Sequence, residues 1–143
     1  MRPVEEILPH RSPFLFLDEV LEMDDTTIKA RRKVRADEPH FAGHYPHRPI
    51  MPGVLLCETV VQAGAYLMAS KMGEDAGMRG APVVARLNNV KFKNMVTPGD
   101  ELEIHAEHLK SRAGAHMMKG HILVGGKVAC SLEFTVMLVE DEA

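Results

Sequence analysis

Cysteine is scarce in this chain of 143 residues, which contains only Cys57 and Cys130. The two lie far apart and form neither a CxxC pair nor another spacing typical of metal ligands. Small secreted domains commonly rely on several disulfide bonds, whereas proteins of reducing compartments do not. The cysteine content therefore favours a cytosolic setting over a secreted one.

An excess of basic charge is also lacking. The chain has 17 Lys and Arg against 20 Asp and Glu, a net charge of -3, so its overall charge does not favour nucleic acid or an anionic membrane. Residues 1–6 are acidic and lack the apolar run of a signal peptide. Glu58 and Gln62 interrupt the most apolar segment, so we expect no membrane span and a cytoplasmic protein.

Linkers, internal repeats and low-complexity segments are missing as well. The hydrophobic fraction of 45% and the charged fraction of 26% are those of an ordinary globular domain. A chain of this length can bury a core of its own. We therefore expect a single domain that spans residues 1–143.

Periodicity and turn residues predict six strands and two helices. The strands are expected at 14–23, 26–34, 82–94, 100–112, 114–124 and 127–139, with turns at Asp24-Asp25, Pro98-Gly99-Asp100 and Gly125-Gly126. We expect a short helix at 3–8, an irregular proline-rich stretch at 36–52 and a loop at 74–80. The one long helix, 53–70, is nearly all apolar, which indicates burial on most sides.

This order of elements predicts an α+β fold. Two strands, one long buried helix and four further strands suit a curved antiparallel sheet wrapped around a central helix. A single sheet has free edges, and pairing two such edges across a two-fold axis covers them. We therefore expect at least a homodimer.

A histidine and a glutamate lie on either side of the start of the long helix. His44 lies in the proline-rich stretch, and Glu58 lies just past the first helical turn. A histidine titrates near pH ~6.5, and an acid on an apolar helix face is desolvated, which raises its pKa. The two groups suit acid–base catalysis, with neutral His44 as the base and protonated Glu58 as the acid.

Neighbouring residues complete this candidate site. The N–H of Gly53, at the positive end of the helix, is a candidate donor to developing negative charge. Gln62, one turn beyond Glu58, is placed to orient the carboxylate or to hold a water. Leu55, together with 14–16, is a candidate lining for an apolar pocket.

Simpler interpretations stand beside this one. His44 can be a structural histidine, and Glu58 can act only on the helix dipole. His40, His44 and His47 can bind a metal, although the prolines among them indicate a loop and no acidic or cysteine ligand completes the set. The basic run at 31–33 is interpreted as a solvated strand face rather than a binding site.

Several motifs, in order and at matching spacing, resemble the 3-hydroxyacyl-acyl-carrier-protein dehydratases of the FabZ type. The matching pieces are Leu8-Pro9-His10-Arg11-Ser12-Pro13-Phe14-Leu15, Gly43-His44-Tyr45-Pro46, Pro49-Ile50-Met51-Pro52-Gly53-Val54-Leu55, Glu58 with Gln62-Ala63, Val90-Lys91-Phe92-Lys93, Val96-Thr97-Pro98-Gly99-Asp100 and Gly126-Lys127-Val128-Ala129-Cys130. The similarity runs from about residue 5 to about residue 138.

This resemblance implies a hot-dog fold with active sites at a dimer interface. His44 would come from one subunit and Glu58 from the other. The resemblance also implies a trimer of dimers, a substrate carried on acyl carrier protein, and no metal or organic cofactor. Basic residues that could meet the carrier are Arg48, Arg86, Lys91 and Lys93.

The chain departs from the family pattern near the histidine. Tyr45 replaces the usual phenylalanine, keeps its shape and remains a candidate substrate contact. His47 and Arg48 follow where a glycine is usual, and Thr59 replaces a small residue after the glutamate. These changes bear on chain length and on carrier contact, and they leave both chemical groups in place.

The leading hypothesis is dehydration of a 3-hydroxyacyl group on acyl carrier protein to a trans-2-enoyl product in fatty acid synthesis. A hot-dog thioesterase, using the helix glutamate, is one alternative, and a non-catalytic acyl-binding protein is another. A thioesterase leaves the placement of His44 unexplained, and a protein without activity would be expected to lose His44 or Glu58. The related coenzyme A hydratases carry an aspartate where this chain has Pro39.

Overall fold

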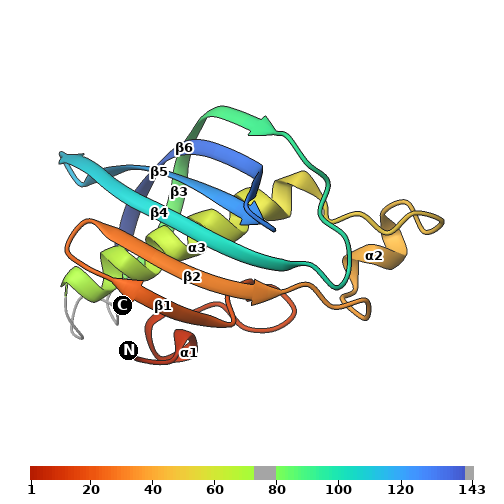
Figure 1. Cartoon of the computed structure of the whole chain (residues 1–143). Coiled ribbons are helices and arrows are strands. Elements are labelled where there is room, and N and C mark those ends of the chain that lie inside the picture. Colours follow the sequence, from red (N-terminus) through yellow and green to blue (C-terminus); the bar gives the residue numbers. More distant parts are fainter. Residues whose placement is uncertain (73–79, 141–143) are drawn as a thin grey trace.

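The computed structural model describes residues 1–72 and 80–140. Two short helices and one long helix accompany six strands (Figure 1). In chain order the elements are α1 (Val4–Ile7), β1 (Glu19–Met23), β2 (Thr27–Lys33), α2 (His40–Gly43), α3 (Gly53–Met72), β3 (Gly80–Phe92), β4 (Glu101–Arg112), β5 (Ala115–Val124) and β6 (Lys127–Glu140).

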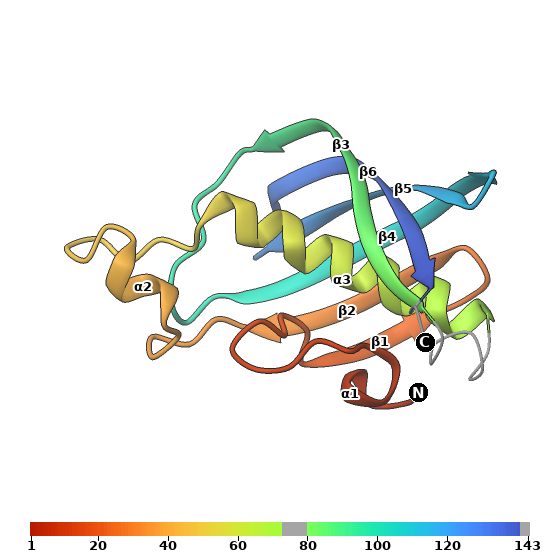
Figure 2. The ribbon, with the colours of Figure 1, turned by 180° about the vertical axis from the view of Figure 1, so that it is seen from behind.

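The strands form one antiparallel sheet in the order β1-β2-β4-β5-β6-β3. Figures 1 and 2 show the sheet curving around α3, with β1 and β3 at its two edges. The turn between β5 and β6 has φ 56° at Gly125 and 81° at Gly126, the backbone that a two-residue hairpin requires. The predicted α+β fold with a curved sheet around one helix is confirmed.

The core lies between α3 and the concave face of the sheet. In β4, buried Leu102, Ile104 and Ala106 alternate with more exposed residues, as a strand with one covered face requires. Gly120 of β5 permits close approach of both β4 and α3, because a Cβ there would lie 2.4 Å from the His105 carbonyl oxygen and 2.4 Å from Val60 Cγ1. Helix and sheet thus pack at a spacing that no larger residue allows.

The long helix is more apolar than we expected from the sequence. The stretch Gly53–Lys71, with a mean hydropathy of 1.3, is long and apolar enough to cross a membrane, so the expectation that Glu58 and Gln62 interrupt it was wrong. Within the fold, however, 67% of this stretch is buried by the protein itself. Sheet residues cover the apolar surface, as in the core helix of a globular domain.

Three other sequence predictions need correction. The strand predicted at 14–23 begins only at Glu19, and the stretch predicted as irregular contains α2, whose Phe41 is buried. Arg32, predicted on a solvated face, is 3% exposed. Most of the loop predicted at 74–80 lies outside the described residues, and Gly80 begins β3.

Candidate active site

Glu58 occupies a partly buried position on α3. Its side chain is 20% exposed, and burial raises the pKa of the carboxyl, an effect that interaction with the Gln62 side chain partly offsets. A carboxyl group with a raised pKa holds its proton closer to neutral pH than an exposed one does. It can therefore donate a proton at a pH where an ordinary glutamate is ionised.

Gln62 lies one turn further along α3 and fixes the chain that covers the helix. Its Oε1 accepts a hydrogen bond of 2.8 Å from the Phe16 N–H, and its Nε2 donates one of 2.8 Å to the Phe14 carbonyl. A side chain therefore takes the place of a neighbouring strand at Phe14 and Phe16, whereas Asp18 N already bonds to Arg31 O of β2. Gln62 therefore holds the Phe14–Phe16 segment beside Glu58.

His10 lies beside Glu58 and was not among the residues singled out from the sequence. Its Nε2 is 3.8 Å from Glu58 Oε1, and both side chains are 20% exposed. Burial, and to a lesser degree the charge of Arg11, lower the pKa of His10. The only sequence signal was the position of His10 inside a family motif, because no local spacing relates residue 10 to residue 58.

His44 lies at the C-terminal cap of α2, on a segment that projects beyond the sheet (Figures 1 and 2). Its Nδ1 lies 3.0 Å from the Ile50 carbonyl oxygen, which can only accept a hydrogen bond. Nδ1 therefore carries the proton, and in the neutral ring Nε2 keeps the free lone pair. This tautomer gives His44 a nitrogen that can accept a proton.

Tyr45 stands next to His44 and points largely into solvent. The residue is 65% exposed, its φ is 47°, and its ring meets the His44 ring edge-on with centroids 4.5 Å apart. No hydrogen bond or ion pair joins His44 to Glu58 within the part of the chain that the structure describes. The two predicted chemical groups thus lie on separate elements of one subunit, His44 at the end of α2 and Glu58 on α3.

A buried ion pair attaches α2, and with it His44, to the sheet. Arg32 of β2 donates a hydrogen bond to Glu38, just before α2, and its guanidinium lies 4.9 Å from the centre of the Phe16 ring. Burial lowers the pKa of Arg32 to about 10. His40 of α2 lies 3.8 Å from Glu38. This cluster joins β2, the Phe14–Phe16 segment and α2.

The start of α3 presents backbone N–H groups near Gly53. The Pro52 carbonyl accepts hydrogen bonds from Leu55 N at 3.0 Å and Leu56 N at 3.2 Å, and the first N–H groups of a helix have no acceptor within it. A Cβ at Gly53 would lie 2.9 Å from the Phe92 ring, so glycine lets this ring cover the helix start. Leu55 is half-buried and packs against the core.

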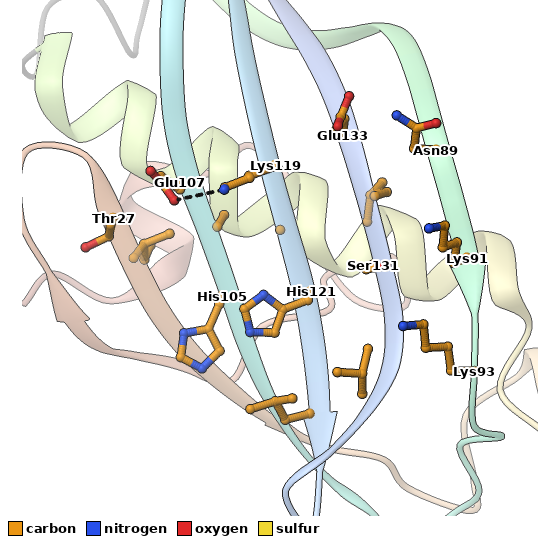
Figure 3. A pocket seen from close by; sticks show the side chains of 16 residues that line it. Thr27, Asn89, Lys91, Lys93, His105, Glu107, Lys119, His121, Ser131 and Glu133 are labelled. Carbon is orange, nitrogen blue, oxygen red and sulfur yellow. Dashed lines mark ion pairs between the residues drawn. The ribbon is translucent and has the colours of Figure 1, made fainter.

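No group of three or more His, Cys, Asp or Glu residues able to hold a metal occurs in residues 1–72 and 80–140. A cavity of about 800 Å³ lies over β4, β5 and β6, and Figure 3 shows its polar side chains on the face of the sheet opposite α3. Lys91 and Lys93 line it, whereas His44 and Glu58 do not. The cavity is therefore separate from the candidate acid and base.

Comparisons with known proteins agree with these features. The model of the FabA-like domain matches residues 8–133. The chain is 42% identical over 130 residues to a 3-hydroxyacyl-acyl-carrier-protein dehydratase FabZ of Clostridium perfringens. The aligned residues make up 91% of each of the two chains. It is also 39% identical over 140 residues to a bifunctional LpxC/FabZ enzyme of Bacteroides thetaiotaomicron, and spans 30% of that longer protein.

A solved structure supports the same fold. The dehydratase heterocomplex ApeI:P from Xenorhabdus doucetiae matches with a TM-score of 0.84 and 20% identity, over 99% of this chain and 93% of that one. The structural likeness shows the hot-dog fold, and the sequence matches show the family. The chain therefore belongs to the FabA-like family and, within it, to the 3-hydroxyacyl-acyl-carrier-protein dehydratases of the FabZ type.

Proposed function

We propose that this protein removes water from 3-hydroxyacyl groups on acyl carrier protein to give trans-2-enoyl groups in fatty acid synthesis. The burial of Glu58 on the core helix is the observation that carries the proposal, because it gives the carboxyl the raised pKa that a general acid needs. The FabZ-type family to which the chain belongs points to the same reaction. The protein then acts as a hydro-lyase.

Two proton transfers accomplish the reaction. His44 Nε2 takes the proton from the carbon next to the thioester carbonyl, and the electron pair of that C–H bond forms the new C=C bond. Glu58 gives its proton to the departing hydroxyl, and the C–O bond breaks to release water. The N–H of Gly53 stabilises negative charge that builds on the thioester oxygen. One C–H and one C–O bond break, one C=C and one O–H bond form, and no oxidant or reductant is consumed; we propose no metal or organic cofactor for this reaction.

The other predicted residues support this chemistry indirectly. Gln62 fixes the segment that flanks the acid, and Leu55 and Tyr45 contact the acyl chain or its carrier arm. Arg48 and Arg86, together with Lys91 and Lys93, are proposed to attract the acidic carrier by charge. We also propose that residues 1–143 act as one cytoplasmic domain.

We place the complete site between two subunits. The edge strand β3 supports this arrangement, because residues 83–89 are exposed and include Val83 at 46% and Leu87 at 47%. A second copy paired along β3 would cover these side chains and the exposed edge. His44, on its projecting segment, would then face Glu58 of the partner subunit. Three such dimers would form the hexamer that the family resemblance implies.

Mass spectrometry of the acyl carrier protein tests the reaction. We expect the native protein to remove one water from 3-hydroxyacyl chains, and His44→Ala and Glu58→Gln each to lose activity by ~10²-fold or more. Retained activity in both variants would contradict the assigned roles. Release of free thiol without loss of water would instead identify a thioesterase.

A mixing experiment tests the shared site. A dimer of one His44→Ala chain and one Glu58→Gln chain has one intact site if the residues come from different subunits. Random mixing after co-refolding should therefore restore about a quarter of native activity. If both residues of a site came from one chain, every site in the mixture would be defective and no activity would return. Each variant refolded alone is the control.

A further inference from the structure

Each dehydration in the proposed site transfers one proton to His44 and removes one from Glu58. If the proposed function holds, His44 ends the reaction protonated and Glu58 ends it ionised. The next turnover requires Glu58 to recover a proton. Among the described residues, His10 forms an ion-pair contact with Glu58 and has no part in the proposed mechanism.

His10 is placed to exchange a proton with Glu58. The 3.8 Å between His10 Nε2 and Glu58 Oε1 is about 1 Å longer than a hydrogen bond, so a small closing movement or one bridging water connects them. The other ring nitrogen, Nδ1, is buried and has no hydrogen-bond partner among the described residues. In the part of the chain that the structure describes, the polar contact of this ring is therefore the one between Nε2 and Glu58.

The backbone around His10 is held firmly. Arg11 donates hydrogen bonds to the carbonyls of Leu8 at 2.8 Å, His10 at 2.6 Å and Glu5 at 2.9 Å. Beyond His10 in the chain, Gln62 holds the Phe14–Phe16 segment against α3. This double attachment fixes His10 beside Glu58.

The charges around the pair favour proton return. In the resting site, burial favours the neutral forms of both groups, and the Arg11 guanidinium further opposes a cation on His10. Gln62, on the same face of α3, is uncharged. Once Glu58 has given up its proton, a carboxylate faces His10, and this nearby negative charge favours the imidazolium.

We infer that His10 returns the proton to Glu58 after each turnover, so that Glu58 is an acid again when the next substrate binds. His10 takes a proton from solvent and passes it on: the Nε2–H bond breaks, an O–H bond forms at Glu58, and the imidazole becomes neutral. His10 does not touch the substrate, and it acts only through Glu58.

Rapid-quench kinetics test this inference on the full-length native protein and His10→Ala. We expect the variant to form the first enoyl product per site at nearly the native rate, followed by turnovers slowed at least about tenfold, with KM lowered in proportion so that kcat/KM stays native. Added imidazole should restore part of the steady-state rate. His10→Gln, which keeps a polar side chain but cannot titrate, should show the same burst.

A matched control is His121→Gln. Burial also lowers the pKa of His121, but this residue lines the cavity on the opposite face of the sheet. It should show native kinetics. Equal slowing of first and later turnovers in both His10 variants, or native steady-state rates in either, would overturn the role of His10. An inactive native protein would instead refute the proposed function itself.

Discussion

At the scale of single residues, the proposed acid role of Glu58 and the stability of the fold place opposite demands on the pKa of its carboxyl. A group whose pKa is higher in the folded than in the unfolded chain binds its proton more tightly when folded. Ionising it therefore disfavours the folded state. This cost is absent below the unfolded pKa of about 4.3 and grows as the pH rises toward the raised folded value.

Glu58→Gln should accordingly be more stable than the native protein at about pH 8, where the native carboxyl tends to ionise. The advantage should shrink as the pH falls toward about 4, because both side chains are then neutral. Thermal unfolding at fixed protein concentration measures this difference. A constant difference in Tm across this range would mean that burial of Glu58 does not shift its ionisation.

At the scale of whole elements, the attachment of α2 to the sheet decides where His44 stands. Arg32 and Glu38 form the link, with side chains only 4% and 12% exposed. Removing one member of a buried ion pair leaves an uncompensated charge, which costs more than losing an exposed pair. The position of α2 and His44 therefore depends on Arg32, which was predicted from the sequence to lie on a solvated strand face.

Glu38→Gln should destabilise the protein by ~3 kcal/mol and lower kcat, because the Arg32 charge is left buried and α2 loses its attachment. Arg32→Met with Glu38→Gln should recover stability and leave activity low. The matched control is Arg31→Met, because Arg31 lies one residue away and pairs with Glu19 and Glu101 at the surface. Urea unfolding and steady-state kinetics measure both effects. An equally large loss of stability and kcat in Arg31→Met would show that these effects do not come from the buried pair.

Some elements of the fold depend on local signals in the sequence, and others depend on contacts between distant residues. The long helix and the Gly125-Gly126 hairpin were predictable because apolar composition and turn chemistry act over a few residues. The conformation of Phe14–Phe16 was not predictable, because Gln62, 46 residues away from Phe16, supplies hydrogen bonds to this segment. His10 escaped notice for the same reason, since its link to Glu58 exists only after folding.

At the scale of the whole molecule, the apolar edge strand β3 stays exposed to solvent in a single subunit. Val83, Leu87 and Phe92 are each about half exposed. A long, apolar, unpaired edge is a site of association. In the proposed dimer this edge is covered, so stability and activity should both depend on protein concentration.

Leu87→Lys should convert the protein to smaller species and abolish dehydration, because a buried charge would disfavour pairing along β3. Leu109→Lys is the matched control: Leu109 of β4 is 48% exposed, against 47% for Leu87. Analytical ultracentrifugation and circular dichroism should show that both variants fold and that only the first loses assembly. A Leu87→Lys protein with native size and activity would place the interface elsewhere.

The position of α3 in the chain has a consequence for biosynthesis. The ribosome completes this apolar helix before it makes β4, β5 and β6, the strands that cover it. At ~5–20 residues per second, the 68 residues from Met72 to Glu140 take roughly 3–14 s to synthesise. During that interval the nascent chain offers a segment that resembles a membrane anchor. Chaperones that bind apolar segments should therefore engage this chain chiefly while the final strands are being made.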